Sequence, residues 1–216
     1  MTTPDPAEAH ILRSLPLFPL GTVLFPAGRL PLRIFEVRYL DMIGKCAKTG
    51  APFGVVALTQ GSEVRKPGAS ESFSAVGTIA TLEQVETPQP GLMVVRCSGA
   101  QRFRIDSSSQ LKHGLWIADV QRIPDDPHIA VPADLEGTAN ALGTLIASLQ
   151  QRAIPADQMP LAAPYQLEDC AWVANRWCEL LPLPLTLRQR LMELDTPLVR
   201  LELVGDILER QGLLPK

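Results

Sequence analysis

The spacing of apolar residues changes once along this chain of 216 residues, and the change constrains the fold more than any other feature. Up to about Ile123, apolar residues come in short or alternating runs, which is the period of strands; from about Pro132 they recur every three or four positions, as in helices. The stretch between carries several prolines and two adjacent acids. The sequence therefore predicts a β-rich lobe over 1–123, a linker over 124–131 and an α-helical lobe over 132–216.

Short runs with turn-forming residues between them are typical of a β-barrel, because closure removes exposed sheet edges. The expected strands are 15–20, 30–35, 53–58, 76–82, 92–97, 102–105 and 115–123. The turn groups are Pro26-Ala27-Gly28, Lys66-Pro67-Gly68 and Pro88-Gln89-Pro90-Gly91. Residues 36–48 instead keep helical spacing, and Gly50 is suited to end that helix. We expect a closed or nearly closed barrel with one helix.

The helical half shows its own start and stop signals. Apolar residues keep helical spacing over 135–149 and again over 167–181. Thr186 and Gln189 have the spacing of a capping box, Pro197 suits a first helical position, and Gly212 is a natural stop. A small helical bundle follows, so the predicted fold class is α+β.

Charge and cysteine usage exclude several classes. A net charge of −3 and a pI near 5.6 argue against a general nucleic-acid binder, which carries a basic face. The 4 cysteines form no C-x-x-C pair and the 3 histidines lie beside none, so no zinc spacing is present and we expect no metal or cofactor. No apolar run is long enough for a membrane helix, and the first ten residues lack the pattern of a signal peptide. We expect a cytoplasmic protein with reduced thiols and no membrane contact.

Motifs of catalysis are missing as well. The chain holds no phosphate-binding G-x-x-x-x-G-K-[ST] loop, no G-x-S-x-G elbow and no H-E-x-x-H helix. We expect no Ser–Lys or other recognisable catalytic constellation, and hence no hydrolysis of ATP or casein.

Four groups of residues have a functional and a structural interpretation, and the structural one is favoured for each. Asp125-Asp126-Pro127-His128 has ligands for a hard cation or for acid–base work, or is a solvated turn. Cys170 and Cys178 fit core packing. Trp172 and Trp177 form a ligand-binding pair or pack in the core or between domains. A further set forms a basic stripe on the barrel or a solvated strand face: Arg96, Arg102 and Arg104.

Several segments resemble the Lon protease N-terminal, substrate-binding domain. The most specific is Leu15-Pro-Leu-Phe-Pro-Leu-Gly-Thr-Val-Leu-Phe-Pro26, followed by Leu30-Pro-Leu-Arg-Ile-Phe-Glu-Val-Arg-Tyr39. Two later segments, Val76-Gly-Thr-Ile-Ala80 and Gly99-Ala-Gln-Arg-Phe-Arg-Ile105, keep the family's order. Ala27 and Val37 stand where the family pattern leads us to expect Gly and Pro. The resemblance covers nearly the whole chain.

The physical properties of these motifs agree with a barrel opening. The prolines suit strand ends or edges, and Gly28 permits a backbone angle that other residues avoid. The apolar residues expected to fill the barrel interior are Leu17, Leu20, Val23, Leu32 and Ile34.

The resemblance implies a barrel like that of RNA-binding PUA domains, a helical subdomain, and a non-catalytic module for exposed or unfolded polypeptide. A groove beside the strand-to-helix junction is the expected peptide site, with Arg33, Phe35, Glu36, Arg38 and Tyr39 as its residues. Expected partners are unfolded or tagged polypeptides in protein quality control, or a protease or chaperone that the chain serves as an adaptor. A homo-oligomer is a further expectation. Binding of a small molecule or nucleic acid on the barrel remains the alternative, since fold does not fix function.

Overall fold

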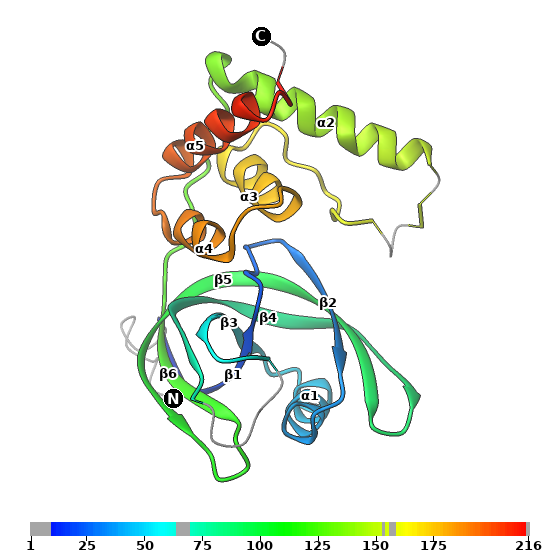
Figure 1. The fold of residues 1–216 in the computed structure, drawn as a ribbon, viewed down its shortest axis with the longest axis vertical. Coiled ribbons are helices and arrows are strands. Elements are labelled where there is room, and N and C mark those ends of the chain that lie inside the picture. Colours follow the sequence, from blue (N-terminus) through cyan, green and yellow to red (C-terminus); the bar gives the residue numbers. More distant parts are fainter. Residues whose placement is uncertain (1–9, 64–69, 153, 156–158, 215–216) are drawn as a thin grey trace, which may run out of the picture. The chain divides into compact units, whose positions relative to one another are not determined.

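The computed structural model describes residues 10–63, 70–152, 154–155 and 159–214. The predicted turn Lys66-Pro67-Gly68 lies outside these residues. The chain divides into two compact units, residues 1–125 and 126–216, called below the β unit and the helical unit. Figure 1 draws both as ribbons.

The β unit is built on a sheet of six strands in the order β2-β5-β4-β3-β1-β6, in which β5 also pairs with β6. The strands are β1 (Ile11–Leu20), β2 (Arg29–Ile34), β3 (Phe53–Gln60), β4 (Ser72–Gln89), β5 (Leu92–Gln110) and β6 (Trp116–Arg122). Because β1, β3, β4, β5 and β6 each pair with the next and β6 returns to β1, these five close into a ring (Figure 1). Strand β2 pairs only with the first part of β5 among the described residues, so it lies outside that ring. The predicted barrel is confirmed.

The two strands expected over 92–97 and 102–105 are one continuous strand, β5. Gly99 does not end it. A side chain there would place its Cβ 2.1 Å from the carbonyl oxygen of Phe25, so the glycine permits a close approach between two segments. The register against β4 shifts between the pairs Thr78–Arg102 and Ala80–Gly99, so the strand is irregular at this point and continues beyond it.

The turn before β2 differs in detail from the expectation. Its positive φ, 58°, belongs to Ala27 and not to Gly28. The Ala27 amide donates to the Gly99 carbonyl at 2.8 Å, and the Gly99 amide donates to the Gly28 carbonyl at 2.8 Å. These bonds hold the turn against β5 although no glycine occupies the strained position.

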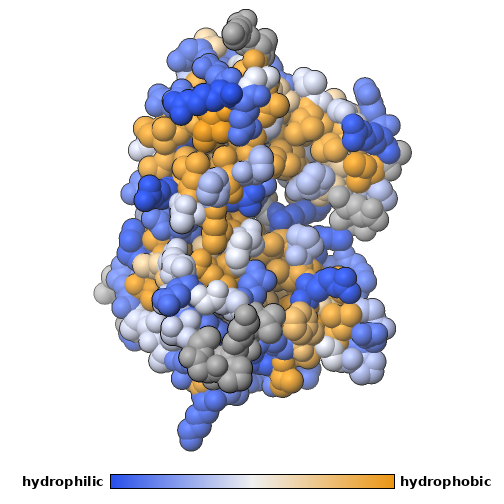
Figure 2. Space-filling view, in the orientation of Figure 1, coloured by the Kyte–Doolittle hydropathy of each residue, from blue (hydrophilic) through white to orange (hydrophobic). Residues whose placement is uncertain are grey.

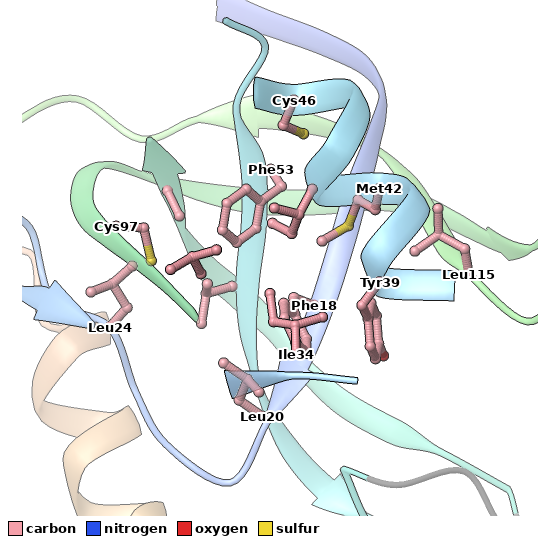
Figure 3. Close-up of a cluster of buried hydrophobic side chains, with 14 residues drawn as sticks. Phe18, Leu20, Leu24, Ile34, Tyr39, Met42, Cys46, Phe53, Cys97 and Leu115 are labelled. Atoms are coloured by element: carbon pink, nitrogen blue, oxygen red, sulfur yellow. The ribbon is translucent and has the colours of Figure 1, made fainter. Parts of the chain in front are cut away.

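Apolar side chains on the two faces of the sheet form two separate clusters. The smaller one surrounds Phe103, whose ring lies against the bare Cα positions of Gly54 and Gly77. The larger one lies on the opposite face and is covered by α1 (Val37–Thr49), which contributes Tyr39, Met42, Ile43 and Cys46 (Figure 3). Leu17 belongs to the smaller cluster, whereas Leu20 and Ile34 belong to the larger one and Leu32 packs against it partly exposed. The residues expected to share one interior therefore divide between two.

Helix α1 ends as the sequence predicted. Gly50 adopts a φ of 70°, and its amide donates to the Cys46 carbonyl at 2.8 Å. Such a left-handed terminal residue satisfies carbonyls that the last turn leaves open.

The helical unit contains α2 (Glu136–Gln151), α3 (Cys170–Leu180), α4 (Leu185–Glu193) and α5 (Pro197–Arg210), and α3 packs against α5. All residues from 170 to 178 are buried, including Cys170, Cys178 and both tryptophans, which confirms core packing for the cysteines. Pro197 opens α5, and Gly212 follows it at a φ of 68°, both as predicted. The expected capping box is wrong, because α4 begins after Pro184 and Thr186 already lies inside it.

Figure 2 shows apolar surface, in orange, on the visible face of both units. None of the helices among the described residues has the length and hydropathy needed to cross a membrane.

Candidate functional site

A cavity of about 330 Å³ lies along β2 in the β unit. Four of the five predicted site residues line it: Arg33, Phe35, Glu36 and Tyr39. Phe18 and Leu20 of β1 line it from the other side, and Glu63 contributes a carboxylate. The volume is at the small end of the range of about 300–1,000 Å³ in which ligand sites fall. The sequence did not indicate the lining residues from β1, Thr22 or Glu63, because contacts between segments that are distant in the sequence bring them to β2.

Phe35 is the exposed apolar group at this cavity. It is 57% exposed and directly follows β2, and Val37, the first residue of α1, is 71% exposed. Arg33 is also exposed. An aromatic side chain and a guanidinium beside a cavity are the kinds of group that most often contribute binding energy.

Tyr39 belongs to the core more than to the surface. It is 3% exposed, and its ring stacks on that of Phe18 with centroids 4.0 Å apart (Figure 3). Burial raises the pKa of Tyr39, so its hydroxyl stays neutral. Tyr39 can form part of the cavity wall, but its main contribution is to join α1 to the sheet.

Arg38 makes contacts that tie three segments together. It is 5% exposed, and it donates to the Gly114 carbonyl at 2.9 Å, to Glu36 at 3.1 Å and to Glu71 at 3.3 Å. Glu71 also accepts a bond from the indole nitrogen of Trp116 at 2.9 Å. Burial acts to lower the pKa of Arg38, but Tyr39 and the two glutamates outweigh it and the pKa is raised. The arginine therefore remains a cation that holds the start of α1 to the loop before β6.

A second cavity of about 600 Å³ lies beside α1. It is lined by polar groups, among them Lys45 and His113, and by apolar ones, among them Met42 and Leu111. Its walls come from α1 and from the turn before β6, which are more than sixty residues apart, so no local pattern predicted it. A third cavity, of about 610 Å³, lies in the helical unit between α2 and the segment around Leu167.

The basic stripe is wrong at one of its three positions. Arg102 is 4% exposed, so it does not present its charge on the barrel surface. Arg96 bonds to Gln84 at 3.0 Å, and Arg104 is exposed. Without Arg102 the exposed cations on β5 form no continuous row for a nucleic-acid backbone.

The solvated turn expected at Asp125–His128 is wrong for one of its acids. The Asp126 side chain is 8% exposed and lies 2.6 Å from Arg200. His128 keeps a ring 70% exposed, with Nδ1 at 2.6 Å from a carboxylate oxygen of Asp169. Across the residues that the structure describes, no group of three or more His, Cys, Asp or Glu side chains converges as a metal site.

Two buried cysteine thiols are kept protonated by their surroundings. Burial raises the pKa of Cys97 and that of Cys178 to about 12 each, so neither supplies a thiolate near neutral pH. One S-x-x-K spacing does occur, contrary to expectation, as Ser109-Gln-Leu-Lys112. Ser109 is on β5 and Lys112 in the turn after it, so no helix brings the two to one face.

Trp172 and Trp177 contact different groups and form no aromatic pair. Trp177 donates from its indole nitrogen to the Thr138 carbonyl at 3.0 Å, and the Trp172 ring meets that of Tyr165 edge-on at 6.1 Å. Both are 6% exposed, which agrees with their interpretation as core residues.

Comparisons with known proteins all point to one family. The profile of the ATP-dependent protease La (LON) substrate-binding domain matches residues 14–210. Lon protease 2 of Herpetosiphon aurantiacus is 29% identical over 218 residues, which cover 96% of this chain and 25% of that protein. The chain thus spans about a quarter of the length of this relative.

Two solved structures share the architecture. The Lon N-terminal domain protein of Xanthomonas campestris matches with a TM-score of 0.68 and 29% identity, over 94% of this chain and 100% of the other. The N-terminal domain of Mycobacterium avium complex Lon protease matches with a TM-score of 0.57, over 90% and 97% of the two chains. At 17% identity the second match concerns the fold alone.

Proposed function

Because this chain belongs to the LON substrate-binding domain family, we propose that it binds exposed apolar segments of polypeptide, and that it holds them at the cavity along β2. The observation that carries the proposal is Phe35, which remains 57% exposed beside a cavity whose wall is formed by core residues. A bound apolar segment would cover that ring. In this proposal the chain serves as an adaptor that presents polypeptide to a separate protease or chaperone.

The chemistry of the cavity suits such a segment. Phe18, Leu20 and Tyr39 offer apolar contact at the wall, and Arg33 offers donors for a carbonyl or a terminal carboxylate. Glu36 is already held by Arg38 at 3.1 Å, so it positions the cavity wall more than it binds a ligand. Binding energy is then expected from Phe35 and Arg33, since aromatic and Arg side chains dominate many interfaces.

Phe35→Ala tests this assignment. We expect it to weaken binding of a reduced, permanently unfolded test protein by at least about fivefold, equivalent to about 1 kcal/mol. The melting temperature should stay nearly unchanged, because the ring is exposed. Fluorescence anisotropy of the labelled test protein measures the affinity, and differential scanning calorimetry measures the melting temperature.

Leu111→Ala is the matched control, since Leu111 is 38% exposed and lines the cavity beside α1 instead. Weaker binding in the Leu111 variant with no change in the Phe35 variant would move the site to that second cavity. If the wild-type chain binds none of several unfolded proteins, the proposal is wrong. Tyr39→Ala is unsuitable as a test because it removes a core ring.

A second candidate function is the binding of a small molecule at the cavity beside α1. Its volume of about 600 Å³ is of ligand size, and it combines Lys45, His113 and Asp41 with apolar side chains. That lining favours a compact, largely apolar molecule with a polar group that one of these side chains can bond. Amide chemical-shift changes confined to α1 and the turn before β6, on titration with medium-chain carboxylic acids, would support this candidate.

A further inference from the structure

We propose that the bound polypeptide is recognised through its backbone, as an added strand on the free edge of β2. This inference rests on the proposed function and specifies how the same site works. Strand β2 pairs with β5 from Arg29–Ser98 to Ile34–Met93, and in the described part of the chain no strand pairs with its other edge. An edge of this kind offers unused backbone donors and acceptors to another chain.

The lining of the cavity shows that it follows this edge. Successive side chains of a strand point to opposite faces, so a cavity on one face would be lined by every second residue. Here every residue from Leu30 to Glu36 lines the cavity. A cavity that meets all of them lies beside the backbone, where a further strand would lie.

The opposite wall is also a strand end without a second neighbour. The pairing of β1 with β6 stops at Leu17–Trp116, whereas its pairing with β3 continues to Leu20–Ala57. Phe18 and Leu20 line the cavity from that end. The cavity therefore lies beside β2 and beside the last part of β1, and neither has a second strand partner there among the described residues.

Pro31 indicates which backbone groups are turned outward. A proline in a sheet occupies a position whose missing N–H faces away from the neighbouring strand. The N–H and C=O of one residue in an antiparallel strand point to the same side, and the side alternates along the strand. Residues 31 and 33 therefore face the free edge, where Pro31 offers an acceptor and Arg33 a donor and an acceptor.

The charges at the edge specify the occupant further. Arg33, Glu36 and Glu63 line the cavity, and because Arg38 neutralises Glu36, the charges of Arg33 and Glu63 balance there. An extended, largely apolar segment without a strong net charge complements this lining. Recognition through the backbone requires no particular sequence, which suits a binder of unfolded chains.

Arg33→Pro tests the backbone donor, and Arg33→Ala is its matched control. Both remove the exposed side chain, but only the proline removes the N–H that faces the free edge. With a capped peptide of alternating valine and threonine as the probe, we expect Arg33→Pro to weaken binding by about tenfold more than Arg33→Ala does. Equal affinities of the two folded variants would overturn strand addition.

A modified probe keeps the test valid if Arg33→Pro fails to fold. The same peptide, N-methylated throughout its valines and threonines, keeps its side chains but loses its backbone donors, and we expect the wild-type chain not to bind it. If both peptides bind equally, strand addition is wrong while polypeptide binding stands. If neither binds, both proposals are wrong. Self-association that Arg33→Pro abolishes, without peptide binding, would assign the edge to a second copy of this chain.

Discussion

Ala27 adopts a left-handed backbone conformation, with a φ of 58°, at an exposed position in the turn before β2. That conformation costs a residue with a Cβ about 1–2 kcal/mol, while glycine loses about 0.5–1 kcal/mol more in chain entropy on folding. We expect Ala27→Gly to raise the free energy of unfolding by about 0.5–1 kcal/mol. Urea unfolding measures the change.

Ala27→Val is the opposing variant, because a branched side chain tolerates this conformation least. It should lower the free energy of unfolding. A Gly variant less stable than the wild type would mean that the turn adopts another conformation in solution.

Buried charged residues are the part of the candidate site that the sequence could not place. Arg38 looks like an exposed residue near the start of a helix, yet its partners Gly114 and Glu71 are 76 and 33 residues away. Arg102 stands in an alternating pattern typical of a half-exposed strand but is 4% exposed. Local periodicity assigns a residue to a face of its own element, and only the long-range pairing decides whether that face is covered. Arg33 and Phe35 are exposed, and their role in binding polypeptide stays a prediction.

Elements were predicted where their signals are local. The ends of α1 and α5 follow from Gly50, Pro197 and Gly212, each of which acts within one turn of the helix. The continuity of β5 was not predictable, because Gly99 serves a contact with Phe25 from a distant segment. The sequence predicted that the strands close into a barrel, but it did not predict their register. The register depends on pairs between strands that are far apart in the sequence.

In the helical unit, Arg200 joins several elements through one side chain. It is 1% exposed and donates to the Leu191 carbonyl at 2.8 Å, to Asn175 at 2.9 Å and to Asp126 at 2.6 Å. Arg200→Met removes the cation from beside a buried carboxylate, so we expect a loss of about 3–5 kcal/mol in the free energy of unfolding. Arg190→Met, at an exposed position of α4, should change it by less than about 0.5 kcal/mol.

Urea unfolding followed by fluorescence in a Trp116→Phe background, which leaves only Trp172 and Trp177 of α3, reports on this unit. Equal losses in the two variants would show that the Arg200 bonds contribute nothing specific. Arg200→Lys keeps the charge but loses the fork of donors, and its stability should lie between those of Arg200→Met and the wild type.

At the scale of the whole molecule, the change of apolar period predicts a linker over 124–131, and the chain divides into its two compact units between Asp125 and Asp126. The backbone of the predicted linker differs in its hydrogen bonding along its length. Its later part is bound to the rest of the helical unit, since Ala130 bridges to Asp169 and Val131 donates to the Glu168 carbonyl at 2.9 Å. Pro124 and Asp125 are exposed.

The contacts of Ala130 and Val131 with the helical unit leave only the first part of the linker as the expected site of initial proteolysis. Cleavage requires a segment that can leave its hydrogen bonds and enter an extended conformation, which exposed and weakly bonded backbone does most easily. We expect brief treatment with a nonspecific protease to cut between Ile123 and Asp126, and to spare 129–131. Mass spectrometry of the first fragments identifies the bond. First cuts within 129–131, or inside α2, would show that the bridge to Asp169 does not persist in solution and that the helical unit begins later in the chain. The Asp126→Asn variant, which weakens the contact with Arg200, should be cut faster at the same place.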